Sequence, residues 1–549
     1  MNWFIGTLFL LTLLFLWKNY NNKRRLKRLK KYFSETWGYP KKERHFNFYS
    51  IGQYFKNNFH KKDSFHIISD RTANDLDIDA VFKFIDRTVS KIGQQFLYYK
   101  LRTVQNIDSL NNFDTLTNLF ATDKDLRLKC QLILYKISAN SNYDFELLIN
   151  KKPIEKPNYL KYIYGLSVLS VLAILLGFIN PVFFLMLLPI FAVNIALHYK
   201  NKQNVNSYIN AINQLNRSLS VGQQLAKFDK IKSHFKELSF LKKISKIKLK
   251  TEFVSIDRHI DNGFLMVLWY TVELIKIQFN LSTILFYSFI DSITKDIKSI
   301  DNLYQFIGKI ESAISIASVK SGNLTICKPV FSKEKHINTI GIYHPLIENC
   351  VENSLVLDNK SLLLTGSNMS GKTTFIRTLA VNSILAQTLN FCFASKYNAP
   401  FLKVHSSIRI TDDLLDDTSY YLKEVLTIKE LIEASKDSHP CLFVLDEIFK
   451  GTNTIERISG GKAILSYLNK KQHIVVVSTH DIELTDLLKI DDFDLFHFTE
   501  KITNNELFFD HKLKKGKLTT RNAIKILELY NYPNDIINNA KLIEKKYFR

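Results

Sequence analysis

The 549-residue sequence has little cysteine, and no arrangement of it that builds a cross-linked or metal-bound fold. The five cysteines are scattered and odd in number, and no C-x-x-C pair occurs: Cys130, Cys327, Cys350, Cys392 and Cys441. Neither a disulfide framework nor a cysteine-ligated zinc site is indicated, and a reducing compartment fits this pattern. The sequence also lacks internal repeats and low-complexity linkers.

Acidic residues are outnumbered, because 75 Lys and Arg residues face 52 Asp and Glu residues, for a formal charge of +23. Such a charge favours polyanionic partners, either nucleic acid or an anionic membrane face. A Lys-, Asn- and Ile-rich composition along the whole chain explains the charge equally well, so charge alone does not establish DNA binding. The length leaves room for three or four domains, and a hydrophobic content of 46% can support large cores.

Charge is absent from a run of 15 residues near the N-terminus, Trp3 to Trp17. A helix of this length rises roughly 22 Å, short of the ~30 Å hydrocarbon core, but including the N-terminus and residues to Tyr20 makes it long enough. A signal peptide is the disfavoured alternative, because the basic residues follow the run and no A-x-A site appears. The basic flank is expected to stay cytoplasmic and the N-terminus outside. It comprises Lys18, Lys23, Arg24, Arg25, Lys27, Arg28, Lys30 and Lys31.

A second apolar block runs from Tyr162 to Tyr199, with a break at residues 177–181, GFINP. Each half has about the length of one membrane span, and Lys161 and Lys200 flank the outer ends. The pattern predicts a transmembrane hairpin with both ends in the cytoplasm; a buried hairpin of a soluble core is the alternative.

A third apolar stretch, Phe264 to Tyr287, contains Glu273, Lys276 and Gln278. It is interpreted as a core or interfacial helix, because ionisable groups are costly at mid-membrane. The N-terminal run and the hairpin then give three spans. The prediction is a multi-pass protein of the cell (inner) membrane, with every charged domain in the cytoplasm.

A phosphate-binding loop is indicated by residues 365–374, TGSNMSGKTT, which fit G-x-x-x-x-G-K-[ST]. An apolar run from Ser361 to Leu364 precedes it as a buried strand would, and a helical pattern from Phe375 to Leu389 follows. The alternative, a Gly-Ser loop that binds no phosphate, is disfavoured by this order of strand, loop and helix. Glycine lets backbone N–H groups close around phosphate oxygens, and the helix N-terminus adds positive dipole. The predicted ATP-binding residues are Gly366, Ser367, Asn368, Met369, Ser370, Gly371, Lys372, Thr373 and Thr374.

Lys372 is expected to reach the β- and γ-phosphates, and the Thr373 hydroxyl to ligate Mg²⁺. A second apolar strand, Cys441 to Leu445, ends in Asp446-Glu447. Asp446 is predicted to bind Mg²⁺, directly or through water, and Glu447 to polarise the attacking water as a general base. A helix N-cap with a surface acid is the alternative for such a pair.

A third strand, Ile474 to Ser478, ends in Thr479-His480. His480 is predicted to contact the γ-phosphate or the attacking water. A lone histidine at a strand end is more often structural, but its position beside the other two motifs favours function. Alternating strands and helices after Pro329 predict an α/β P-loop ATPase domain, with its site at the carboxyl ends of the strands.

The predicted organisation has five parts. An N-terminal anchor and basic flank (1–35) precede a helical region (36–158), the hairpin (159–199), a second helical region (200–328) and the ATPase domain (329–549). A further strand is expected at Leu507–Leu513.

These motifs resemble those of the MutS family. The similarity is carried by residues 365–379 (TGSNMSGKTTFIRTL), 446–454 (DEIFKGTNT) and 478–480 (STH), where the Asn-Met pair and the G-T-[SN]-T set this family apart from other P-loop families. Tyr343-His344-Pro345 resembles the R-H-P entry to the ATPase domain, with tyrosine in place of arginine. The end of the chain, with Gly516, Tyr532-Pro533 and Ala540, resembles the closing segment. A weaker similarity, at Asp70–Leu101, is to the opening helices of the MutS lever.

The resemblance implies a dimer whose ATP sites are composite. Residues 419–424 (SYYLKE) resemble an element that reaches the partner subunit's nucleotide in the family, and this assigns Ser419 to ATP binding. The position whose aromatic packs on adenine in the family is Cys350 here, and His511 is expected to supply the stacking face instead. The resemblance further implies DNA binding of the mismatch-repair type, with an all-α lever region.

The departures from the family matter as well. No room for the mismatch-reading domain is expected ahead of residue 65, and Phe235-Lys236-Glu237 fits its F-x-E wedge only by chance, within a helical stretch. No nuclease module is expected after residue 549. Residues 459–461 (SGG) mimic an ABC-transporter signature but follow the acidic pair instead of preceding it. The membrane spans are foreign to ordinary members.

The sequence therefore predicts a membrane-anchored, MutS-related ATPase that uses ATP and Mg²⁺, with DNA and the membrane as partners. The rival is a membrane-remodelling or transport-coupled ATPase that never touches DNA. A non-hydrolysing, nucleotide-gated scaffold is disfavoured by the presence of Lys372, Asp446 and Glu447 together.

Overall fold

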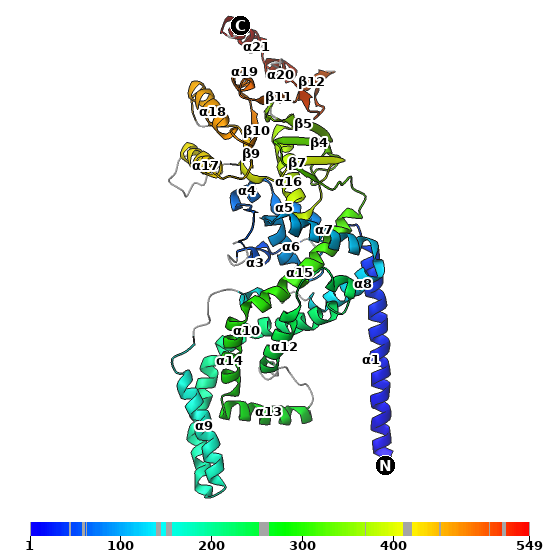
Figure 1. Cartoon of the computed structure of the whole chain (residues 1–549), viewed down its shortest axis with the longest axis vertical. Coiled ribbons are helices and arrows are strands. Elements are labelled where there is room, and N and C mark those ends of the chain that lie inside the picture. Colours follow the sequence, from blue (N-terminus) through cyan, green and yellow to red (C-terminus); the bar gives the residue numbers. More distant parts are fainter. Residues whose placement is uncertain are drawn as a thin grey trace. The chain divides into compact units, whose positions relative to one another are not determined.

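The computed structural model divides into two compact units (Figure 1). Unit 1 consists of Met1–Lys62, Asp86–Tyr99 and Thr115–Gly322, and unit 2 of Asp63–Ile85, Lys100–Asp114 and Asn323–Arg549. The structure describes residues 2–42, 45–56, 61, 63–138, 144–149, 156–251, 263–367, 369–409, 420–449, 452–503, 506–518 and 523–547.

Unit 1 is built of helices in its described part, as the helical patterns predicted. Two further helices, α6 (Lys91–Arg102) and α7 (Ile107–Thr122), have residues in both units. The elements within unit 1 are α1 (Asn2–Glu35), α2 (Phe48–Ile51), α3 (Gln53–Lys56), α8 (Lys124–Leu134), η2 (Tyr135–Ile137), η3 (Asp144–Leu148), α9 (Leu160–Gly177), η4 (Pro181–Met186), α10 (Leu187–Leu225), α11 (Asp229–Lys232), α12 (Ser239–Thr251), α13 (Gly263–Gln278), α14 (Leu281–Lys295) and α15 (Ile297–Lys320).

The predicted hairpin is present as two helices, α9 and α10, joined across the break at residues 177–181. Among the described residues, two helical stretches are long and apolar enough to cross a membrane, Leu160–Gly177 and Pro181–Lys202. The N-terminal run is not one of them. It forms the first half of α1, which continues without a break through the basic flank and extends away from the rest of unit 1 (Figure 1).

The third apolar stretch forms two helices where the sequence predicted one. Helix α13 ends at Gln278 and α14 begins at Leu281, because Asn280 adopts a left-handed backbone conformation with φ of 47°. Asparagine tolerates this conformation better than most residues, so a single residue redirects the chain without a proline or glycine.

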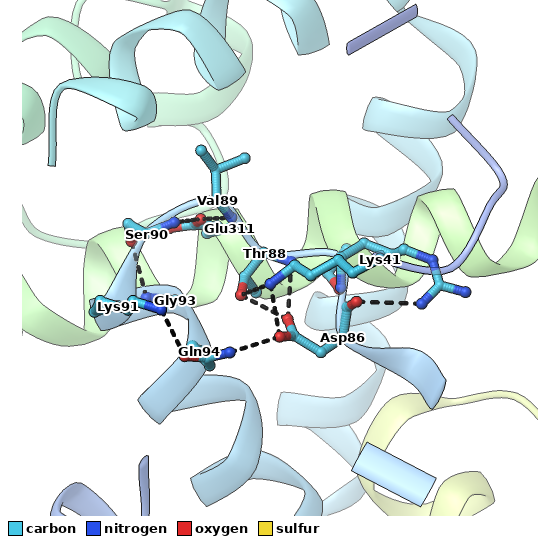
Figure 2. Close-up of polar contacts among 11 residues, drawn as sticks. Lys41, Asp86, Thr88, Val89, Ser90, Lys91, Gly93, Gln94 and Glu311 are labelled. Atoms are coloured by element: carbon cyan, nitrogen blue, oxygen red, sulfur yellow. Dashed lines mark hydrogen bonds and ion pairs between the residues drawn. The ribbon is translucent and has the colours of Figure 1, made fainter. Parts of the chain in front are cut away.

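The core of unit 1 lies around α15, whose buried carboxylate Glu311 accepts hydrogen bonds from the backbone N–H groups of Val89 and Ser90 and from the Ser90 hydroxyl (Figure 2). These bonds fix the start of α6, where Ser90 Oγ also accepts from the Gly93 N–H at 3.0 Å. A Cβ atom at residue 93 would collide with the Glu311 carboxylate. Glycine is therefore required for this approach of α6 to α15.

Figure 2 also shows a second buried acidic residue, Asp86. Asp86 accepts from Lys41 Nζ at 2.7 Å, from the Thr88 N–H at 2.9 Å and from Gln94 Nε2 at 2.9 Å. Burial alone would raise the pKa of Asp86, but the Lys41 ammonium and the hydrogen bonds from Lys41 and Thr88 outweigh it and lower the pKa. Both carboxylates organise the segment between α5 (Ile78–Ile85) and α6.

Unit 2 contains a six-stranded sheet in the order β14-β11-β6-β10-β9-β8, in which only β14 is antiparallel to its neighbour. A four-stranded sheet has the order β3-β7-β4-β5. The strands are β1 (His66–Ile67), β2 (Thr103–Val104), β3 (Val330–Ser332), β4 (His336–Ile342), β5 (Asn353–Asp358), β6 (Ser361–Thr365), β7 (Lys396–Pro400), β8 (Lys403–Ser407), β9 (Cys441–Asp446), β10 (Ile474–Thr479), β11 (Phe493–His497), β12 (Glu500–Thr503), β13 (Glu506–Phe509) and β14 (Lys514–Lys515). Its helices are α4 (Asp70–Asp75), α5, α16 (Lys372–Leu389), α17 (Tyr420–Ala434), α18 (Thr454–Leu468), α19 (Glu483–Lys489), α20 (Ala523–Leu529) and α21 (Asn534–Tyr547).

The strands predicted at β6, β9 and β10 are present, as is the helix α16 after the loop. These strands are buried along almost their whole length, which is why they consist of continuous apolar runs. The strand predicted at Leu507–Leu513 is present but shorter: β13 ends at Phe509 and pairs with β12 outside the six-stranded sheet.

The environment expected for Phe235-Lys236-Glu237 also differs. These residues lie between α11 and α12 and not within a helix. The Phe235 ring packs edge-on against Phe306 of α15, with 4.6 Å between ring centroids. The half-buried aromatic ring packs against α15 and does not project as a wedge.

Candidate functional site

The three sequence motifs meet at one edge of the six-stranded sheet. Strand β10 lies between β6 and β9, and the register pairs Thr479 with Thr365 and Ser478 with Asp446. Parallel strands end at the same edge, so the phosphate-binding loop after β6, the acidic pair at the end of β9 and His480 after β10 are brought together.

The phosphate-binding loop depends on two glycines with positive φ. Gly366 has φ of 152°, and a Cβ there would lie 2.8 Å from Ser370 Oγ and 3.0 Å from the Phe498 carbonyl oxygen. Gly371 has φ of 109° and is the N-cap residue of α16. The first N–H groups of α16 therefore begin at the loop, as an anion site at a helix N-terminus requires.

Lys372 lies at the centre of the loop. Its Nζ donates to the carbonyl oxygens of Gly366 at 2.8 Å and Ser367 at 3.0 Å, and lies 3.5 Å from His480 Nε2. The Ser367 hydroxyl donates to Glu500 Oε2 at 2.7 Å. Met369 is exposed, whereas the predicted site residue Asn368 lies outside the described residues.

The two predicted metal ligands are in direct contact. Thr373 Oγ1 donates to Asp446 Oδ2 at 2.8 Å, and the Ser478 hydroxyl donates to Asp446 Oδ1. Hydroxyl and carboxylate oxygens are the donors that Mg²⁺ prefers, so the residues fit this ion. Across the described part of the chain, no group of three or more His, Cys, Asp or Glu residues is placed to hold a metal. A magnesium ion at Thr373 and Asp446 would thus depend on phosphate and water for its remaining ligands.

Glu447 lies beside His480, with 2.8 Å between Oε1 and Nε2. Its backbone has φ of 59°, and its N–H donates to the Ser478 carbonyl oxygen at 2.8 Å. The carboxylate is thereby held at the sheet edge on the same side as Lys372. An acid and an imidazole in contact beside a phosphate-binding loop can orient and deprotonate a water molecule.

A pocket of about 320 Å³ adjoins the loop, and it is lined by Cys350 and His511, the two residues considered above for contact with adenine. Cys350 lines it from the segment before β5, together with Met369 and Thr374 of the loop. His511 also lines the pocket, and its Nδ1 lies 3.0 Å from the Ser370 carbonyl oxygen. The His511 ring stacks on Phe509, so the imidazole has an aromatic neighbour on one side.

Several residues of the site were not singled out from the sequence. Glu500 is one of them. Another is Arg457 of α18, which forms a two-point ion pair with Asp481, with N–O distances of 2.8 and 2.6 Å. This pair fixes the segment that follows His480. An arginine four residues after a helix N-cap gives no sequence signal for a contact 24 residues away.

Glu424, part of the predicted element at residues 419–424, has a defined contact in the structure. It is buried on α17 and accepts from the Phe449 N–H, in the segment after the acidic pair. Ser419, predicted to contact a partner subunit's nucleotide, lies outside the described residues.

Residues 75–77 support the other end of the same sheet edge. Asp75 accepts from the Ser406 hydroxyl at 2.6 Å and from the N–H groups of Ile408 and Arg409 at 3.1 and 3.0 Å. Asp77 pairs with the Arg409 guanidinium through two bonds of 2.8 and 2.7 Å. The carboxylates thus fix the end of β8, beside β9 and the acidic pair.

Comparison with known proteins agrees with this geometry. The family model of MutS domain V matches residues 362–547. The DNA mismatch repair protein MutS of Listeria monocytogenes serotype 4b is 31% identical over 270 residues, which cover 47% of this chain and 31% of that protein. That of Bacillus licheniformis is 33% identical over 240 residues, covering 41% of this chain and 27% of that protein.

The protein of the same name from Staphylococcus haemolyticus is 32% identical over 228 residues, or 39% of this chain and 26% of the relative. The chain thus spans less than a third of the length of these relatives. MutS domain V is a P-loop ATPase domain, and the matched region contains the loop, the acidic pair and His480. The C-terminal part of the chain, residues 362–547, therefore matches MutS domain V, and this part of the sequence is related to the MutS proteins.

Proposed function

We propose that this protein is a membrane-anchored ATPase that hydrolyses ATP and binds DNA in an ATP-dependent, mismatch-repair-related process. One observation carries the proposal: the Thr373–Asp446 contact and the Glu447–His480 contact lie at the aligned ends of three neighbouring parallel strands. Phosphoryl transfer needs phosphate positioning, metal ligands and a water-activating group together, and this edge supplies all three.

Within the proposed site, the loop backbone and Lys372 bind the phosphates, while Thr373 and Asp446 hold Mg²⁺. The ion would neutralise charge on the phosphate oxygens. Glu447 accepts a proton from the attacking water, and His480 orients that carboxylate. Adenine occupies the pocket beside the loop, with His511 as its stacking face in place of an aromatic at Cys350.

The proposed assembly is a homodimer with composite ATP sites. Support comes from the family, whose members act as dimers, and from the buried Glu424, which links α17 to the segment after the acidic pair. Ser419 directly precedes α17, so a movement of α17 caused by a partner subunit would reach that segment through Glu424.

The proposed location is the cell (inner) membrane, with several spans and the ATPase domain on the cytoplasmic side. The hairpin supports this, because large apolar side chains along α9 and α10 are exposed within unit 1, among them Leu172, Ile179 and Leu188. A soluble protein rarely leaves so much apolar surface in water. The flanking Lys161 and Lys200 favour a cytoplasmic base.

The same exposed hairpin favours a second candidate from another class, an ATPase that drives membrane remodelling or transport and does not contact DNA. Under this candidate the charge of +23 reflects composition or anionic lipid.

The two candidates separate in an ATP turnover assay on the full-length protein in nanodiscs of uncharged lipid. Added DNA, as duplex, branched or single strands, should raise turnover and bind less tightly as salt increases, because each neutralised phosphate releases about 0.9 counterion. Little preference for a mismatch is expected, since the Phe235 ring packs against Phe306 of α15 and does not project as a wedge. Intact turnover without any DNA response or DNA binding at low salt would select the membrane process.

A further inference from the structure

Helix α13 has its polarity reversed with respect to a helix on a water-soluble surface. Among its described side chains, Tyr270, Leu274 and Ile275 are exposed by 53%, 54% and 47%, whereas Lys276 is only 4% exposed. At 100° per residue, these three apolar side chains and Thr271 share one face, and Glu273 and Lys276 share the opposite face. The apolar face points outward and the charged face inward.

The inward charges have partners. Glu273 lies 3.4 Å from Lys276 Nζ and 3.7 Å from Nε2 of His198, a buried residue of α10. Charged residues within lipid are found facing the interior of a helix bundle and paired with one another, whereas in water they remain on the surface. The orientation of α13 matches that of a helix within lipid, because its charged residues face inward and are paired.

The end of α13 is closed by polar side chains of the hairpin. Asn194 Nδ2 donates to the Gln278 carbonyl oxygen at 2.6 Å, and the Ser170 hydroxyl donates to the same atom at 3.2 Å. The Ser167 hydroxyl donates to the Phe279 carbonyl oxygen at 2.7 Å. These two carbonyl groups lie at the Asn280 break. Water would satisfy them at no cost, but in lipid such groups must be satisfied by the protein itself.

We propose that α13 is a further membrane-embedded element beside the hairpin and that its face of Tyr270, Leu274 and Ile275 contacts lipid acyl chains. The proposal rests on the membrane anchoring proposed above. The lipid-facing surface is continuous with that of the hairpin, because α13 is bound to both α9 and α10 through the polar groups at the break. A helix of 16 residues is about 24 Å long, too short to cross a ~30 Å core. In Figure 1 it runs crosswise to α9, so it lies along the membrane.

The test uses a single tryptophan as a reporter of acyl chains in the full-length protein. The four native tryptophans, Trp3, Trp17, Trp37 and Trp269, are changed to phenylalanine. One tryptophan is then introduced as Leu274→Trp on α13, as Leu172→Trp on the hairpin, or as Tyr467→Trp on α18 of unit 2. All three positions are comparably exposed, and Tyr467 is the control facing water. Each variant is reconstituted in vesicles of plain lipid or of lipid brominated along its acyl chains.

We expect brominated lipid to quench the emission of the Leu274→Trp and Leu172→Trp variants and to leave the Tyr467→Trp variant unchanged. Quenching at 172 without quenching at 274 would overturn the contact of α13 with lipid and leave the anchoring intact, and a second copy of the chain covering this face would give the same result. Absence of quenching at both positions would overturn the anchoring itself. Ile275→Trp, on the same face, repeats the measurement if Leu274→Trp disturbs folding.

Discussion

His480 Nε2 and Glu447 Oε1 lie 2.8 Å apart, although 32 residues separate them in the sequence between two strand ends. The contact joins the residue predicted to activate water with the residue predicted to sense the γ-phosphate. His480 Nε2 also lies 3.5 Å from Lys372 Nζ. A single imidazole therefore lies between the proposed base and the proposed phosphate-binding lysine.

The first prediction concerns hydrolysis. Glu447→Gln should retain ATP and stop turnover, because the amide cannot accept the water's proton while Thr373 and Asp446 remain to hold Mg²⁺. Lys372→Ala should weaken ATP binding instead. Equilibrium nucleotide binding and single-turnover phosphate release measure the two effects separately. Wild-type turnover by the Glu447→Gln protein would remove Glu447 from the proposed role.

The second prediction concerns the support of β8. Asp75→Ala should destabilise unit 2 by about 2–4 kcal/mol, because the hydroxyl and two N–H groups that the carboxylate accepts would lose their partner in a buried place. The exposed neighbour offers a control, as Asn74→Ala removes no side-chain hydrogen bond of this set. Urea unfolding followed by circular dichroism measures both. Equal stabilities for the two variants would contradict the account.

The third prediction concerns topology. A cysteine at Ile179, which is 82% exposed at the hairpin turn, should react with an impermeant maleimide in intact cells. A cysteine at Lys202 should react only after permeabilisation, because the lysines at the hairpin base favour the cytoplasm. The unsubstituted protein controls for reaction of Cys327 and Cys350, which are half-buried. The reversed labelling pattern would exclude a cytoplasmic base.

The fourth prediction concerns acid stability of unit 2. Burial and the neighbouring Arg377 charge lower the pKa of His344 to about 4, and burial lowers the pKa of His66 to about 4. Between pH 6.5, about the pKa in the unfolded chain, and pH 4, the unfolded chain binds protons that the folded unit does not. As the pH is lowered through this range, the free energy of unfolding of unit 2 therefore falls by about 1.4 kcal/mol per pH unit for each histidine. His344→Gln should flatten this slope, and an unchanged slope would remove His344 as a cause.

The stability of unit 1 should change with pH in the opposite direction to that of unit 2. Burial raises the pKa of Asp301 to about 6, so the stability that its protonated form contributes is lost as pH rises through 6. All four tryptophans belong to unit 1, and their emission therefore reports its unfolding alone. Between pH 7 and pH 5, the tryptophan transition in urea should move to higher urea while unit 2 loses stability. Parallel shifts of both transitions would count against these assignments.

The meeting of the three motifs in the candidate site was predictable because its signals are local. Three buried parallel strands appear as apolar runs, and each is followed directly by its polar motif, so strand order was the only missing information. The break at Asn280 was not predictable, since one asparagine in a left-handed conformation leaves no mark on the hydropathy of the flanking residues. Contacts such as Glu311 with Ser90 join residues 221 apart and depend on packing that no local pattern specifies.

The close approach of α6 to α15 constrains how this chain can diverge. Because a side chain at residue 93 would collide with the Glu311 carboxylate, a larger residue at position 93 is tolerated only when residue 311 also changes. Relatives with glutamate at the position of residue 311 should therefore carry glycine at the position of residue 93. A recombination that joined this glutamate to a larger residue at position 93 would encode a unit 1 in which α6 cannot approach α15 in this way.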